Sequence, residues 1–170
     1  MPREQMAART AAPAAPDATA SAPLSDGGKT RTVDTRFGTI EFDLDQALTF
    51  PKAIPGFIGY QLFGLAMIPS ETQSSFMLLQ ALEPTDLSFI VLPYDSAADL
   101  IDAKDVDAAQ QSLGIAPADC AIMLIATFRK LGDRFETSVN MRAPIFIDTA
   151  NRLAWQYILP NDRYDVRHVL

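Results

Sequence analysis

Leu48-Thr49-Phe50-Pro51-Lys52-Ala53-Ile54-Pro55-Gly56-Phe57 is the stretch of sequence around which the chain is organised. Its two prolines fix φ and lack a backbone donor, so neither a helix nor a strand continues through it. Gly56 follows Pro55 and supplies the freedom that a chain reversal requires. The segment is nevertheless rich in apolar side chains, namely Leu48, Phe50, Ile54 and Phe57. The stretch therefore predicts an irregular, rigid and apolar loop, which either seals one end of a barrel or serves directly as a binding surface.

On both sides of this loop the chain is divided into short segments of strand type, separated by turn residues. Gly38 separates the first two segments, and Glu83-Pro84-Thr85-Asp86 and Gly132-Asp133 make later connections. Alternation of side chains defines the faces, as in the segment where Phe135, Thr137, Val139 and Met141 share one side. We expect strands over residues 30–37, 39–42, 64–68, 76–82, 88–92, 121–128, 135–141, 144–147 and 153–159. Aromatic residues at strand spacing are interpreted as core, namely Phe76, Phe89, Phe146 and Trp155.

One segment has the features of a helix. Asp102 is a suitable N-cap, Asp105 lies three residues further on, and Gly114 is a suitable end. One face of this helix carries Val106, Ala109, Gln110 and Leu113. Many short strands with a single short helix predict a mainly β fold, either a small antiparallel β-barrel or a sandwich-like single domain.

The domain is predicted to span residues 29–170. Residues 1–28 are nearly all Ala, Pro, Thr and Ser, with no apolar period, and are expected to form a disordered Ala/Pro-rich tail. They also lack the apolar region of a signal peptide, and no later run reaches the length of a membrane span. Cys120 is the only cysteine, so no internal disulfide can form. Together these features predict a cytoplasmic protein.

The charge of the chain argues against several kinds of partner. The formal net charge is −7. Binding to nucleic acid needs clustered Lys and Arg, so direct nucleic-acid binding is not expected, and neither is binding to an anionic membrane. A basic protein partner suits this charge better.

Residues for catalysis or for cofactor binding are scarce. His168 is the only histidine, and it could pair with Cys120 only if the C-terminal region folds back. This pair is the sole basis for the alternative of a small β-domain hydrolase; an apolar-flanked cysteine is more often core. The sequence has no phosphate loop, dinucleotide motif or complete zinc ligand set, so no cofactor and no metal are expected. An acidic cluster is interpreted as a solvated face or, alternatively, as a docking patch for a basic partner: Asp95, Asp99, Asp102, Asp105 and Asp107.

Several stretches in the right order together resemble the FliW family of flagellar assembly factors. They are 37–40, Leu48-Thr49-Phe50-Pro51, Ile54-Pro55-Gly56-Phe57, Leu79-Gln80, 83–89, 140–145, Asn151-Arg152 and 164–168. The resemblance covers about residues 30–170. Members of the family commonly carry an acid directly after the Pro-Gly-Phe, where this chain has Ile58-Gly59.

The resemblance implies a β-rich cytoplasmic protein that is not an enzyme. Such a protein binds flagellin and, alternatively, the translational regulator CsrA, and when released from flagellin it opposes the repression of flagellin mRNA translation by CsrA. The contact residues expected from the matching stretches are Phe57, Ile58, Pro84, Asp86, Asn140 and Arg142. A third hypothesis treats the chain as a structural subunit that associates with itself through an open sheet edge.

The tail assignment can be tested by truncation. Removal of residues 1–28 is expected to leave the melting temperature unchanged within error, because a segment without an apolar face has little to pack on the domain. A clear fall in the melting temperature would place the domain boundary inside the removed segment.

Overall fold

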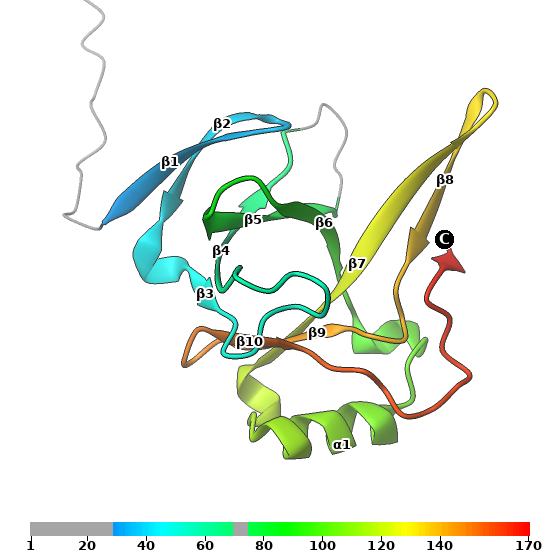
Figure 1. The fold of residues 1–170 in the computed structure, drawn as a ribbon. Helices are drawn as coiled ribbons and strands as arrows, with labels where there is room; N and C mark the ends of the chain where they lie inside the picture. Colours follow the sequence, from blue (N-terminus) through cyan, green and yellow to red (C-terminus); the bar gives the residue numbers. More distant parts are fainter. Residues whose placement is uncertain (1–28, 70–74) are drawn as a thin grey trace, which may run out of the picture.

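The structure is a computed structural model that describes residues 29–69 and 75–170. The expected disordered tail, residues 1–28, lies outside the described residues. The predicted mainly β fold with one helix is confirmed over the part described (Figure 1). The elements are β1 Thr30–Thr35, β2 Gly38–Asp43, β3 Leu48–Thr49, β4 Leu62–Met67, β5 Met77–Glu83, β6 Ser88–Pro93, α1 Ala103–Leu113, β7 Cys120–Leu131, β8 Arg134–Val139, β9 Ile145–Asp148, β10 Leu153–Gln156 and β11 His168–Val169. Short 3₁₀ turns cover Leu44–Gln46, Ser96–Ala98 and Pro117–Asp119.

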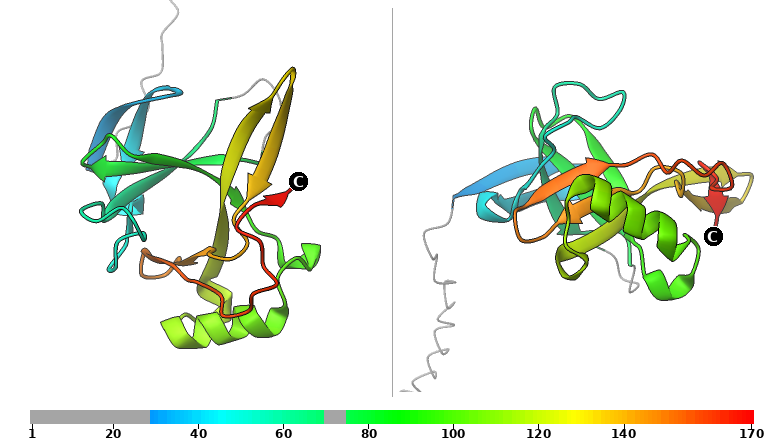
Figure 2. Two further views of the ribbon diagram at one scale, coloured as in Figure 1. Left: turned by 45° about the vertical axis from the view of Figure 1, so that its right-hand side comes forward. Right: turned by 90° about the horizontal axis from the view of Figure 1, so that it is seen from below.

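Most of the strands form one sheet that curls into a ring. The strand order is β11-β8-β7-β6-β5-β4-β3-β10-β9, and β9 also pairs with β7. The ring can be seen in Figure 1 and in the left view of Figure 2. Of the two predicted architectures, the barrel is therefore the closer one.

The weakest point of the ring is the pairing of β3 with β10. It consists of one parallel pair, Thr49 with Leu153, and a hydrogen bond of 2.9 Å from Thr49 N–H to the carbonyl of Arg152. The sheet is thus ring-like and not a regular closed barrel. The predicted antiparallel pairing is found between all the other named strands, and this single pair is parallel. Strand β3 is only two residues long, and its position depends on the apolar loop that follows.

Two cores lie on the two faces of β9. Ile145 and Ile147 pack inside the ring with the loop residues Phe50 and Ile54. Phe146 points the other way, into a core that it shares with α1 and the C-terminal segment. All four residues of β9 are therefore buried, and this strand joins the two halves of the interior.

The expected aromatic core is only partly correct. Phe146 is fully buried, whereas Phe76, Phe89 and Trp155 are half-buried at the edges of the cores. Phe135 shares one side of its segment with Val139 and Met141, as the alternation predicts, but it is exposed whereas those two residues are buried. The reason is that β7 and β8 extend beyond the ring as a two-stranded hairpin with no sheet behind them (Figure 1).

Helix α1 begins and ends where the sequence predicts. The carboxylate of Asp102 accepts a hydrogen bond from the N–H of Lys104, and Gly114 ends the helix with φ of 72°. Val106, Ala109 and Gln110 are buried against the outer side of the ring. The helix is therefore fixed both by its caps and by an apolar face.

The hairpin β1–β2 forms a separate two-stranded sheet that packs on β4 and β5. Its buried residues are Val33 and Phe42, which meet Leu82 of β5. Gly64 of β4 makes this packing possible, because a Cβ on Gly64 would lie 2.3 Å from Cδ1 of Phe42. The lack of a side chain at Gly64 sets how closely the hairpin approaches the ring.

Gly64→Ala is expected to lower the free energy of unfolding by about 1–3 kcal/mol, because the added methyl group overpacks the contact with Phe42. Urea denaturation followed by fluorescence measures this change. In a double-mutant cycle, Phe42→Leu should cost less stability in the Gly64→Ala background than in the natural chain. Purely additive effects of the two substitutions would show that the clash is not the cause.

Candidate functional site

The loop between β3 and β4 is held from inside the ring. Phe50 is completely buried and its N–H donates to the carbonyl of Gln61 at 2.8 Å. Ile54 is also buried, and Gly56 reverses the chain with φ of 90° so that Phe57 N–H donates to the carbonyl of Ile54 at 2.8 Å. The sealing role expected for this apolar loop is therefore confirmed for Phe50 and Ile54.

The outer side of the same loop presents apolar groups to solvent. The ring of Phe57 is half-buried and packs edge-on against Phe89, with 5.0 Å between centroids and 87° between planes. Ile58 is 92% exposed. The loop therefore combines a buried anchor with an apolar tip whose backbone is fixed.

The connection between β5 and β6 lies against this loop. The hydroxyl of Tyr60 donates to Oδ1 of Asp86 at 3.0 Å. This hydrogen bond to the Asp86 carboxylate, followed by burial and the negative charge of Asp86, raises the pKa of the Tyr60 phenol. Pro84 and Asp86 are both exposed. Four of the six predicted contact residues thus lie on two loops that touch, residues 55–60 and 83–87, which we call the two-loop surface.

Gln80 shapes the second of these loops. Its side chain is 2% exposed, and Nε2 lies within hydrogen-bonding distance of the carbonyls of Ala81, Thr85 and Leu87 at 3.0, 2.8 and 3.0 Å. A buried amide with these contacts fixes the course of the chain around Pro84. Sequence reasoning identified Gln80 only as part of a matching stretch; a lone polar residue in an otherwise apolar strand was the available signal.

The other two predicted contact residues lie elsewhere. Asn140 and Arg142 belong to the connection between β8 and β9, on the C-terminal side of the ring (Figures 1 and 2). The side-chain oxygen of Asn140 accepts from the N–H of Ala143 at 3.0 Å, and Arg142 forms an ion pair with Asp162 at 2.6 Å. The structure gives both residues a role in holding loops, and it does not bring them to the two-loop surface.

The acidic cluster is used in part for structure. Asp95 and Asp102 cap helical turns, and Asp102 also pairs with Arg163 at 2.9 Å. The N–H of Lys104 and the guanidinium of Arg163 hold the pKa of Asp102 below its ordinary value. Asp105 accepts a hydrogen bond from the Tyr164 hydroxyl, so these acids attach α1 to the C-terminal segment. Asp99 and Asp107 are exposed.

The Cys120–His168 pair does not form. Cys120 is the first residue of β7 and lies opposite Asp148 of β9. His168 of β11 pairs with Val139 of β8, and Val139 pairs with Ala126 of β7, so His168 is level with Ala126. Six residues of strand, about 20 Å, separate these positions along β7. Burial raises the pKa of the Cys120 thiol, which is the opposite of what an activated nucleophile needs.

Within residues 29–69 and 75–170, no group of three His, Cys, Asp or Glu residues is arranged to hold a metal ion. None of the helices described is both long and apolar enough to span a membrane.

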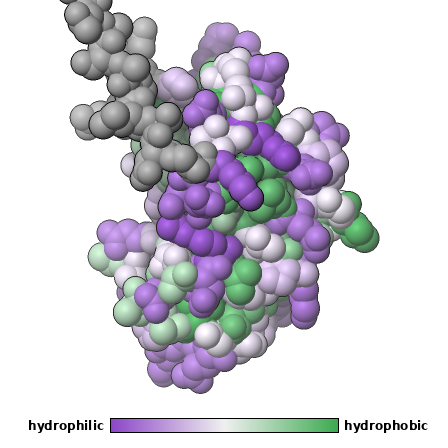
Figure 3. Space-filling model, turned by 90° about the vertical axis from the view of Figure 1, so that its left-hand side faces the viewer, coloured by the Kyte–Doolittle hydropathy of each residue, from purple (hydrophilic) through white to green (hydrophobic). Residues whose placement is uncertain are grey.

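The face on the side of the β1–β2 hairpin shows hydrophobic areas separated by hydrophilic ones (Figure 3).

Comparison with known proteins gives one consistent result. The sequence model of a family described as FliW protein matches residues 31–170. The flagellar assembly factor FliW of Desulfitobacterium hafniense (strain Y51) is 32% identical over 138 residues, covering 80% of this chain and 88% of that protein. The FliW protein of Syntrophotalea carbinolica is 30% identical over 144 residues, 82% of this chain and 97% of that protein. A crystal structure of the flagellar assembly factor FliW superimposes with a TM-score of 0.66 at 29% identity, covering 82% of this chain and 96% of that one.

Gln80→Met is expected to lower the free energy of unfolding by about 1–3 kcal/mol, because it removes a buried donor and leaves the Thr85 carbonyl without that partner. Hydrogen exchange should accelerate at the amides of residues 85–87. Gln111→Met, an exposed position on α1, is the matched control and should change neither quantity. Unchanged exchange in the Gln80 variant would show that the loop holds its shape without the amide.

Proposed function

Because the chain belongs to the FliW family of flagellar assembly factors, we propose that it acts in the cytoplasm by binding flagellin and, alternatively, the translational regulator CsrA. Release from flagellin would then free it to oppose the repression of flagellin mRNA translation by CsrA. The observation that carries this proposal is the two-loop surface, where a rigid apolar tip stands beside exposed polar groups.

Flagellin binding is assigned to the apolar part of this surface. Ile58 is 92% exposed, and the loop that carries it is anchored by Phe50 and Ile54 inside the ring. A preformed surface loses little conformational entropy when a partner binds. The amphipathic helices of a flagellin terminus can place their apolar face on such a surface by helix-in-groove docking.

CsrA binding is assigned mainly to charge. An RNA-binding protein carries basic surface, and this chain has a net charge of −7. Opposite charges accelerate association and favour the correct partner. Asp86 beside the apolar tip, and the exposed Asp99 and Asp107 before and on α1, are available for this purpose.

The proposed function depends on binding and not on catalysis. The alternative of a hydrolase depends on Cys120 and His168, which lie far apart along the sheet. Alanine at either position should therefore leave partner binding intact. A single cysteine in the whole sequence agrees with a reducing compartment.

Ile58→Ser and Phe57→Ala are expected to weaken flagellin binding, by about 1–3 kcal/mol for an aromatic side chain that is an anchor of the interface. Binding is measured by calorimetry with purified flagellin. Met67→Ala, an exposed apolar side chain at the far end of β4, is the control and should bind like the natural chain. Melting curves are needed for Phe57→Ala, because its ring also packs on Phe89.

The two partners should also differ in their response to salt. Exposed charges are screened beyond about 8 Å at physiological ionic strength, so association with CsrA should slow as salt rises while flagellin binding changes little. Equal salt dependence for both partners, together with normal flagellin binding by Ile58→Ser, would contradict the assignment of the two partners to different forces.

A further inference from the structure

The outer half of the β7–β8 hairpin stands free of the ring. On one side, β6 pairs with β7 only as far as Ala126. On the other side, β11 pairs with β8 at Val139 and Ser138, and Leu170 N–H donates to the Thr137 carbonyl at 3.0 Å. Figure 1 shows the hairpin rising from the ring with β11 beside only its base.

From Thr137 toward the hairpin turn, the edge of β8 that faces away from β7 is open. Because the Thr137 carbonyl faces β11, the N–H and C=O of Phe135, two residues away, face the same edge. No strand among the described residues pairs with them there. Phe135 therefore offers one donor and one acceptor to an incoming strand, which is the arrangement that sheet edges use to recruit another chain.

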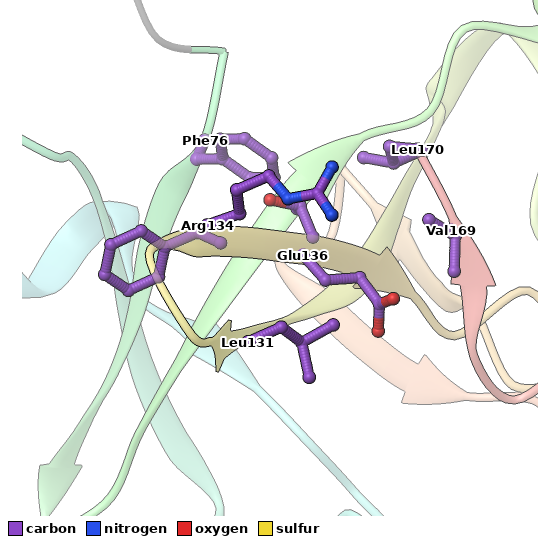
Figure 4. A pocket seen from close by; sticks show the side chains of 8 residues that line it. Phe76, Leu131, Arg134, Glu136, Val169 and Leu170 are labelled. Carbon is purple, nitrogen blue, oxygen red and sulfur yellow. The ribbon is translucent and has the colours of Figure 1, made fainter.

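A pocket of about 500 Å³ lies beside β8, next to this edge (Figure 4). It is lined by four consecutive residues of β8, Arg134 to Thr137, by Leu131, Val169 and Leu170, and by Phe76, which precedes β5. Phe135 is 72% exposed, and Leu131, Val169 and Leu170 are exposed as well. The edge thus has unpaired backbone groups and apolar side chains in the same place.

We propose that a second copy of this chain occupies the edge, with two β8 strands pairing antiparallel about a two-fold axis at Phe135. In an antiparallel pair centred on Phe135, residue 134 of one copy stands opposite residue 136 of the other. Arg134 then faces Glu136 of the second copy, and Glu136 faces Arg134 of the second copy. The sequence Arg134-Phe135-Glu136 is therefore complementary to itself in this arrangement.

The charges involved are available for this contact. Neither Arg134 nor Glu136 takes part in an ion pair within the described ranges. Within the hairpin, Glu136 lies opposite Arg129 of β7. In the dimer each Glu136 would lie between two arginines, its own Arg129 and Arg134 of the second copy, while the two Phe135 rings meet at the axis.

The other open edge of the hairpin is unsuitable for the same contact. Along β7 the backbone groups that face away from β8 include those of Lys130, which lies opposite Phe135. Pairing about Lys130 would set two lysines against each other, and lysine on an edge is a known protection against sheet extension. Self-pairing is thus favoured at β8 and opposed at β7.

The interface is small, since only residues 134–136 of each copy can pair before Leu170 of one copy meets the hairpin turn of the other. Interfaces below about 1,200 Å² are typical of weak, transient complexes. The dimer is therefore expected to form at high micromolar concentration. This contact is separate from the two-loop surface, so its failure would leave the proposed function untouched.

Arg134→Glu and Glu136→Arg test the pairing by charge reversal. Each variant alone places like charges together twice per dimer and should weaken association about tenfold. An equimolar mixture of the two variants restores both opposite-charge contacts and should dimerise as well as the natural chain. Sedimentation velocity at physiological salt, from about 10 μM to 1 mM, measures the association.

Lys130→Glu is the matched control, because it makes the same change of charge on the same hairpin away from the β8 edge, and it should dimerise normally. Phe135→Asp is a second disruptive variant that removes no core side chain and puts two carboxylates at the axis. A natural chain that stays monomeric at about 1 mM overturns the proposal. So does a dimer that is insensitive to the charge reversals, or a mixture of the two variants that fails to associate.

Discussion

The burial of Phe50 is the contact on which the arrangement of this protein depends. Its ring lies 5.0 Å from that of Phe63, edge-on, in the interior of the sheet. Full burial of a phenylalanine contributes about 1.5–3 kcal/mol, and here it acts at the point where the ring has least hydrogen bonding. Because Phe50 directly follows β3, its position fixes β3 between β4 and β10. It also fixes the first residue of the loop that carries Phe57 and Ile58.

The same arrangement explains how one small domain keeps the two-loop surface in a fixed shape. The ring interior holds one end of the loop at 50–61, and the Tyr60–Asp86 hydrogen bond holds the other end against its neighbour. On the opposite side, Asp102 and Asp105 of the helical region keep the C-terminal segment in place through Arg163 and Tyr164. Much of the acidic cluster therefore stabilises the fold, and the exposed remainder contributes net charge.

Local features were predictable from the sequence, and long-range ones were not. The caps at Asp102 and Gly114, the Gly38 hairpin and the anchored Pro-Gly loop follow from residue preferences over a few positions. The parallel contact of β3 with β10 joins distant parts of the sequence and leaves no periodic signal. The closeness of the 55–60 and 83–87 loops, and the separation of Asn140 and Arg142 from them, likewise depend on how the sheet curls. The exposure of Phe135 could not be predicted, because alternation shows which residues share a face, but not whether anything covers it.

The single-pair contact between Thr49 and Leu153 also has a consequence for the order in which the protein is made. Leu153 belongs to one of the last strands to leave the ribosome, and β9, which pairs with it, is also late. A nascent chain can form the β1–β2 hairpin and the β4–β5–β6 meander early, because these contacts are local. The ring, and with it the final position of the loop at Phe57, must wait until β9 and β10 have been synthesised. A growing chain therefore acquires its completed surface only near the end of translation.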